Sequence, residues 1–204
     1  MDLGVPGWSA RDRDGTRAWE DGFLDWLVDG DFGKQKGSAA NNHGTFHHTQ
    51  VAALAATCRT ALALRTVAVA RTGLIIPQIA AAWGRSQELA RTRGRHYSTF
   101  DRLAFTRLAA VGDRVGVDLR HRTGPEGSAL RQAVGFLLPA ATGAAPWPHP
   151  EPDSHAYAAS DVVHAAADHG DRRARAAPTD LEAPPGGDRW ALRPAPEQLD
   201  GITG

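Results

Sequence analysis

Residues 100–115 read FDRLAFTRLAAVGDRV, and their apolar side chains recur every three or four positions, as on one face of an α-helix. These apolar positions are Phe100, Leu103, Ala104, Leu108, Val111 and Val115. Ser98 or Thr99, just before the segment, carries a hydroxyl that can cap the helix. The pattern predicts an amphipathic helix whose apolar face must be buried against neighbouring elements.

Helical spacing recurs along most of the chain. The further predicted helices cover residues 16–30, 51–62, 74–83, 130–138 and 157–169. Gly30 and Pro139 act as stop signals, and Pro77 must sit in the first turn of its helix or break it. Asn and Gly favour a turn or a helix entrance at 41–45, so the polar groups there are expected on a loop. No alternating β pattern competes, and the sequence therefore predicts an all-α fold of stacked antiparallel helical hairpins.

Composition limits the classes of function. The 204 residues suit one core, and 23 basic side chains balance 23 acidic ones, which gives no general electrostatic attraction to nucleic acid or to a membrane surface. Cys58 is the single cysteine; it excludes an internal disulfide and is expected to be a small buried apolar residue. The start of the chain carries no recognisable signal peptide, and no apolar run approaches the roughly 18 residues of a membrane span.

The composition of the sequence changes after Pro139. Four prolines lie between residues 146 and 152, and a second Pro/Gly cluster occupies 184–187. We expect residues 1–150 to form the helical domain, and residues 151–204 to form a peripheral helix and a loosely ordered tail.

Potentially reactive polar residues gather in two places. The first group is Asn41, Asn42, His43, His47 and His48, and the second is Glu88, Arg91, Arg93, Arg95, His96 and Tyr97. Taken alone, the two asparagines fit a turn or a helix cap, Tyr97 fits a half-buried position, and the arginines fit a solvated surface. His43 and His47 have the spacing of metal ligands on a helix, but a zinc-protease-like site needs Glu where Gly44 stands, and no metal site is predicted.

The two groups together resemble a known family. The run Asn42-His43-Gly44-Thr45-Phe46, with Asn41 before it and Gln50 after it, resembles the first motif of the alginate lyase family, and residues 87–98, QELARTRGRHYS, resemble the second. The motifs occur in the family's order at a similar separation, with weaker similarity over roughly residues 8–149. The resemblance implies an incomplete (α/α) toroid with a cleft for an anionic sugar chain.

The resemblance also implies an activity. The chain is expected to cleave alginate or a related polyuronate by β-elimination, without a cofactor, in the periplasm or outside the cell. The implied catalytic residues are Asn42, His43, Arg91 and Tyr97, and the implied substrate-binding residues are Asn41, Arg95, His96 and Trp83. Either Tyr97 acts as both base and acid, or His43 is the base and Tyr97 the acid; the sequence leaves both open.

Two departures from the family's sequence pattern support a second interpretation of the function. Phe46-His47-His48 replaces the family's aromatic-Tyr-Asp continuation, and Met1 falls shortly before the Trp19 helix, where family members carry further helices. The alternative is a truncated, inactive or carbohydrate-binding remnant of such a lyase. A purely structural helical domain whose motifs match by chance is the third interpretation. The sequence leaves the oligomeric state open.

Overall fold

The structure is a computed structural model that describes residues 7–79, 89, 92–124, 127–149, 151–152, 155–177 and 181–187. Its helices are α1 (Ala10–Asp29), α2 (Asp31–Gly37), α3 (Asn42–Cys58), α4 (Thr60–Gly73), α5 (Ile75–Gln78), α7 (Gly94–Val115), α8 (Ala129–Ala141), the 3-10 helix η1 (Ala156–Ala159), α9 (Ser160–Asp168) and α10 (Arg172–Ala176). Strands β1 (Thr123–Gly124) and β2 (Gly127–Ser128) form a minimal antiparallel pair. The predicted all-α class is confirmed. None of the described helices is both long and apolar enough to cross a bilayer.

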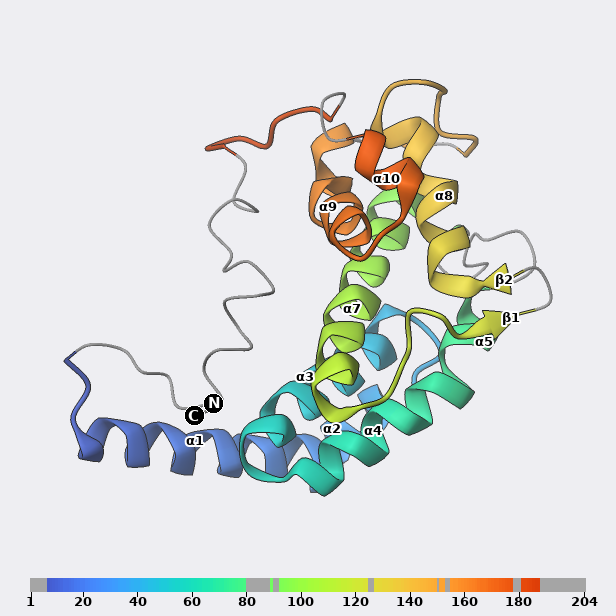
Figure 1. Cartoon of the computed structure of the whole chain (residues 1–204). Helices are drawn as coiled ribbons and strands as arrows, with labels where there is room; N and C mark the ends of the chain where they lie inside the picture. Colours follow the sequence, from blue (N-terminus) through green and yellow to red (C-terminus); the bar gives the residue numbers. More distant parts are fainter. Residues whose placement is uncertain are drawn as a thin grey trace.

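Helix α7 is the central element of the fold. It runs between α3 and α4 at one end of the molecule and α8 to α10 at the other (Figure 1). Phe105 and Leu108 of α7 are fully buried, and they share one apolar cluster with Val67 of α4, Ile75 of α5 and Ala133 of α8. The amphipathic pattern at 100–115 therefore buries most of its apolar face against helices on both sides, while Phe100 at its start is 40% exposed.

Helix α1 contacts the rest of the protein through leucines rather than through its aromatic residues. Leu24 and Leu27 are buried against α3 and α4, whereas Trp19 and Trp26 are 66% and 47% exposed. The rings of Trp19, Phe23 and Trp26 stack on one another with centroids 5.5 and 5.8 Å apart. The helix start at Ser9 is closed by a capping box with Asp12, so α1 begins earlier than residue 16.

A separate apolar cluster joins α8 to the helices that follow it. Val134 and Leu137 of α8 pack with Val162 and Val163 of α9 and with Ala174 of α10. The segment after residue 150 thus contributes to a shared core. The division at residue 150 stays a prediction, and residues 188–204 of the expected tail lie outside the described residues.

Several predicted helix limits are wrong, each for a local reason. Residues 51–62 do not form one helix, because the chain leaves helical geometry at Arg59, whose guanidinium contacts Asp21 and Asp25 of α1 at 2.7 and 2.6 Å. Ser98 and Thr99 do not cap α7: it begins at Gly94, and both side chains are buried inside it.

Two other local expectations also fail. Pro139 does not stop its helix, since α8 continues to Ala141; only α8's last turn loses a backbone bond there. Cys58 is exposed rather than buried, at the last position of α3. The short helix α2 follows Gly30 directly, in a stretch to which no element was assigned. Of the predicted helix 74–83, residues 75–78 are helical with Pro77 inside, and 80–83 lie outside the described residues.

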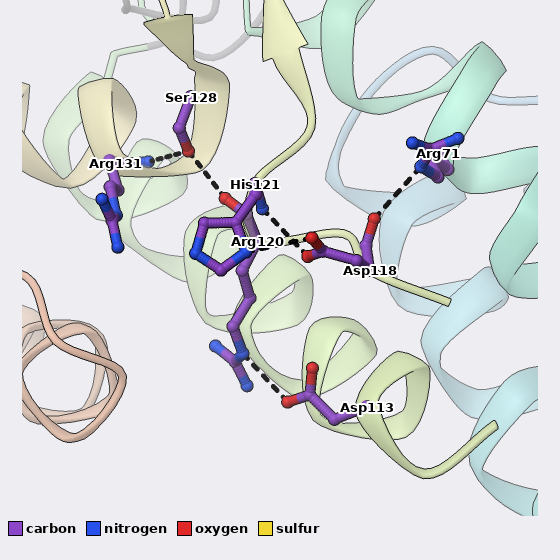
Figure 2. A network of polar contacts seen from close by, with 7 residues as sticks. All are labelled: Arg71, Asp113, Asp118, Arg120, His121, Ser128 and Arg131. Carbon is purple, nitrogen blue, oxygen red and sulfur yellow. Dashed lines mark hydrogen bonds and ion pairs between the residues drawn. The ribbon is translucent and has the colours of Figure 1, made fainter. Parts of the chain in front are cut away.

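The loop from α7 to α8 is held by polar contacts (Figure 2). Arg71 of α4 donates to the carbonyl of Asp118 at 3.1 Å, and the Asp118 carboxylate accepts from the amide of His121 at 3.0 Å. Nε of Arg120 lies 2.9 Å from the carboxylate of Asp113 near the end of α7. These contacts fix the loop across the ends of α4 and α7.

Candidate active site

The first motif forms the N-terminal turn of α3, so the helix entrance expected as one alternative at 41–45 is confirmed, and the expectation that its polar groups lie on a loop is wrong. Asn41 is the N-cap, and its side-chain oxygen accepts a hydrogen bond from the amide of His43 at 3.0 Å. Asn42 is buried, with 5% of its surface exposed, and His43 is exposed. The amide and the imidazole therefore sit on a regular helical turn, which holds them more firmly than a loop would.

Gly44 is required by a close approach of the backbone. A Cβ at this position would lie 2.0 Å from the carbonyl oxygen of Ala39, in the turn between α2 and α3. Because the turn that follows α2 lies directly against the first turn of α3, only glycine, which has no Cβ, fits at this position. This contact determines where Asn42 and His43 are held relative to the rest of the fold.

The second motif forms the N-terminal turn of α7. The amides of Arg95 and His96 donate to the two carboxylate oxygens of Glu151, at 2.7 and 3.3 Å. Glu151 thus satisfies two amides that would otherwise lack partners at the helix start, and its charge is favourable there. His96 is exposed and Tyr97 is half-buried.

Helices α3 and α7 pack in parallel, which brings the two motifs to the same end of the pair. The rings of Phe46 and Phe100 lie 4.2 Å apart, and further along both helices Thr49 donates to the carbonyl of Ala104 at 3.1 Å. Asn42 is one helical turn before Phe46, and His96 is one turn before Phe100.

The side chains of the second motif reach towards this aromatic contact. The His96 ring stacks on Phe100 with centroids 6.1 Å apart, and it meets Tyr97 edge to face at 5.2 Å. Phe46 and Phe100 therefore join the two motifs. Asn42, His43, His96 and Tyr97 lie in the first turns of two parallel helices, and the N-terminus of α7 already holds the carboxylate of Glu151.

Arg95 is placed as a structural link. Its guanidinium is buried and donates to the carbonyl of Ala140 near the end of α8, at 3.0 Å. Burial lowers the pKa of this guanidinium, and the carboxylates of Glu151 and Glu182 oppose that shift. A direct contact between Arg95 and a substrate stays a prediction.

His47 and His48 turn towards backbone carbonyls. Nε2 of His47 lies 3.0 Å from the carbonyl of Leu27, and Nδ1 of His48 lies 2.9 Å from that of Gly44. Burial lowers the pKa of the His48 ring, against the opposing effect of its bond to Gly44. In the part of the chain that the structure describes, no three His, Cys, Asp or Glu side chains are grouped to hold a metal ion.

Some predicted site residues lie outside the described residues, and others were missed. Arg91 and Trp83 belong to the first set. Sequence reasoning did not assign Phe100 or Glu151 to the site. The sequence could have indicated Phe100, because it lies one helical turn after His96 and belongs to the helix predicted at 100–115. Nothing in the sequence indicated Glu151, because 55 residues separate it from His96.

Comparison with known proteins identifies the family. The alginate lyase family matches residues 3–147. Among solved structures, the crystal structure of an alginate lyase from Bacteroides ovatus is similar, with a TM-score of 0.80 at 21% sequence identity. The match covers 89% of this chain and 50% of that chain, so this chain spans half the length of its structural neighbour. No curated protein matches. The chain therefore belongs to the alginate lyase family.

Proposed function

We propose that the chain is a polysaccharide lyase that cleaves alginate or a related polyuronate by β-elimination. The observation that carries the proposal is the parallel packing of α3 and α7. In a member of this family, it puts Asn42, His43, His96 and Tyr97 at the same end of the helix pair. An arrangement with the two motifs at opposite ends would have ruled out a shared site.

The first requirement of the reaction is to offset the charge of the substrate carboxylate. Removal of the C5 proton develops further negative charge next to a group that is already ionised, so donors must be aimed at the carboxylate. We assign this role to Asn42, His43 and Arg91. Loss of one preorganised donor of this kind typically costs about 3–4 kcal/mol of transition-state stabilisation.

The second requirement is a proton acceptor and a proton donor. The base takes the C5 proton, the freed electron pair forms the C4–C5 double bond, and the C4–O bond breaks as its oxygen takes a proton. We propose Tyr97 as the acid. The base is Tyr97 itself or His43, according to which face of the sugar carries the proton. General acid–base groups contribute about 10²–10⁴-fold in rate.

Substrate-binding roles follow from placement. His96 is exposed beside Tyr97, so we propose that it contacts the sugar chain directly. Asn41 holds the His43 amide, and Arg95 ties the first turn of α7 to α8, so both act by positioning the catalytic turns as much as by contact. Trp83 remains a proposed sugar-stacking residue.

The test is a lyase assay on the purified full chain with alginate and other polyuronates. The C4–C5 double bond is conjugated with the carboxylate, so product formation is followed by ultraviolet absorbance. We expect Tyr97→Phe and His43→Ala to abolish product. Tyr157→Phe is the matched control, because Tyr157 is the other tyrosine of the chain and lies in η1. Equal loss in Tyr157→Phe would contradict the assignment of Tyr97.

A carbohydrate-binding remnant is the second candidate, and one observation favours it: His47 and His48, which replace residues of the family's first motif, turn towards backbone carbonyls. This candidate predicts saturable binding of alginate oligosaccharides without any ultraviolet-absorbing product. Neither product nor binding would leave only a structural role. We further propose a periplasmic or secreted location, as expected for a protein that meets a polysaccharide outside the cell.

A further inference from the structure

A cavity of about 50 Å³ lies on the side of α7 that faces α8 and α9. The motifs lie elsewhere, where α7 meets α3. A buried water needs roughly 10–15 Å³ by the same measure, so the cavity has room for a few waters or one small ion and not for a sugar ring. Its lining includes three arginines, Arg102, Arg120 and Arg131, and one carboxylate, Asp171.

Arg120 is the group that the cavity leaves incompletely satisfied. Its side chain is only 15% exposed, and Nε contacts Asp113 at 2.9 Å. Among the described residues, the two terminal nitrogens of its guanidinium have no hydrogen-bond partner. These nitrogens are therefore available to an acceptor that enters the cavity, to which a charged donor binds strongly.

A single hydroxyl fixes Arg120 and Arg131 relative to one another. Ser128 donates to the carbonyl of Arg120 at 2.6 Å and accepts from the amide of Arg131 at 3.5 Å. Figure 2 shows both arginines on either side of this serine, where the loop meets the start of α8. These bonds fix the backbone at both positions, and both side chains line the cavity, where guanidinium groups can bind an acceptor with several oxygens through paired N–H bonds.

The one carboxylate of the lining is only partly engaged. Oδ1 of Asp171 accepts from the amides of Arg173 and Ala174 at the start of α10, whereas Oδ2 is buried without a hydrogen-bond partner in the described part of the chain and lies 3.7 Å from the Arg173 guanidinium. Asp113 is held by Arg120. With three arginines against the one carboxylate in the lining, the cavity keeps an excess of positive charge.

Another lining residue suits the same ligand. His169 lies at the end of α9, and partial burial together with the charge of Arg120 lowers the pKa of its ring below 6.5. A neutral imidazole at neutral pH still offers one N–H donor. It adds a donor without adding repulsion against the arginines.

From this geometry we propose that the cavity between α7, α8 and α9 is a binding site for a small oxyanion, held by the terminal nitrogens of Arg120 and by Arg131. The ligand is a phosphate- or sulfate-like ion, or the carboxylate of a small sugar acid whose remaining atoms lie outside the cavity. The site does not depend on the proposed lyase activity.

The proposal is tested by calorimetric titration of the full chain with inorganic phosphate, sulfate and galacturonate, each against chloride at equal ionic strength. We expect saturable binding of at least one of these probes. Binding of the inorganic ions alone would identify a free oxyanion as the ligand, and binding of galacturonate alone would identify a sugar-acid carboxylate. No saturable binding of any of the three would overturn the proposal and leave a water-filled cavity.

Variants separate a ligand role of Arg120 from a structural one. Arg120→Met should weaken binding at least about tenfold, as expected for a lost charge-assisted bond, whereas Arg107→Met, on the exposed side of α7, should not change it. Asp113→Asn breaks the same ion pair but keeps Arg120, so binding should be unchanged or tighter. Equal weakening in Asp113→Asn and Arg120→Met would refute the role of Arg120. Arg131→Met, which changes an exposed side chain, tests the site if Arg120→Met does not fold; unaltered binding there would count against it.

Discussion

The substitution Gly44→Ala tests the packing that holds the first motif. The added Cβ would lie 2.0 Å from the carbonyl oxygen of Ala39, which is 1 Å inside the shortest separation of about 3.0 Å that real Cβ atoms tolerate. The Cβ is fixed rigidly to the backbone of α3, and the oxygen it meets is also a backbone atom. The turn between α2 and α3 must therefore move. Overpacking typically costs about 1–3 kcal/mol, and an overlap this deep against the backbone belongs to the upper part of that range, about 2–3 kcal/mol; the higher helix propensity of alanine returns about 1 kcal/mol. We therefore expect a net loss of about 1–2 kcal/mol.

The assay is urea unfolding followed by circular dichroism. For a slope of about 2 kcal/mol per molar urea, the expected loss lowers the midpoint by roughly 0.5–1 M. Gly22→Ala is the matched control: Gly22 lies within α1, and a Cβ added there would meet open space, so helix propensity should raise stability by up to about 1 kcal/mol. If Gly44→Ala is as stabilising as Gly22→Ala, the close approach to Ala39 is wrong. If the fold tolerates the change but product formation falls, the turn positions Asn42 and His43.

Three further predictions address the core, a buried histidine and a helix end. Phe105→Ala removes a fully buried ring and should lower the free energy of unfolding by about 3–5 kcal/mol; a loss below about 1 kcal/mol in urea unfolding would contradict its central position. Burial lowers the folded-state pKa of His48 below 6.5, so the unfolded chain binds the proton more readily; the stability contributed by the neutral ring is full above pH 6.5 and is lost as the pH falls through the folded pKa. His48→Gln should flatten this decline in unfolding measured between pH 7 and 5, and an unchanged slope would show that other groups cause it. Hydrogen bonds from Ser9 hold the pKa of Asp12 below 3.8, so the first turn of α1 should fray as the pH falls below that value. The amide chemical shift of Ser9, measured by NMR as a function of pH, should follow this transition. Asp12→Asn should remove the transition.

Helical periodicity predicted the helices well, because a helix is stabilised by contacts between residues that lie close in sequence. Most of the apolar face at 100–115 is the buried face of α7, with Phe100 at its start exposed, because helical spacing is a property of a few consecutive residues. The same spacing predicted the helix at 16–30, yet its apolar residues Trp19 and Trp26 are 66% and 47% exposed. Spacing identifies an apolar stripe, but only the neighbouring helices decide which residues of the stripe are covered.

The candidate site was predictable as a set of residues and not as an arrangement. Asn42, His43 and Tyr97 were found from two motifs, and the family is confirmed. Their placement at one end of a helix pair depends on α3 and α7 packing in parallel, and no local pattern in either helix sets that direction. The carboxylate that caps α7 comes from Glu151, far along the chain, and no local pattern indicates it.

By itself, then, the sequence determined the helical class, most of the helices and the family, because these depend on periodicity and on motif residues that can be compared directly. The tertiary structure alone decided that Phe46 meets Phe100, that Gly44 must accommodate Ala39, and that Arg120 ends in a cavity. The physical reason is that such contacts join segments distant in sequence, and their geometry is set by how whole helices pack rather than by the preferences of any one segment.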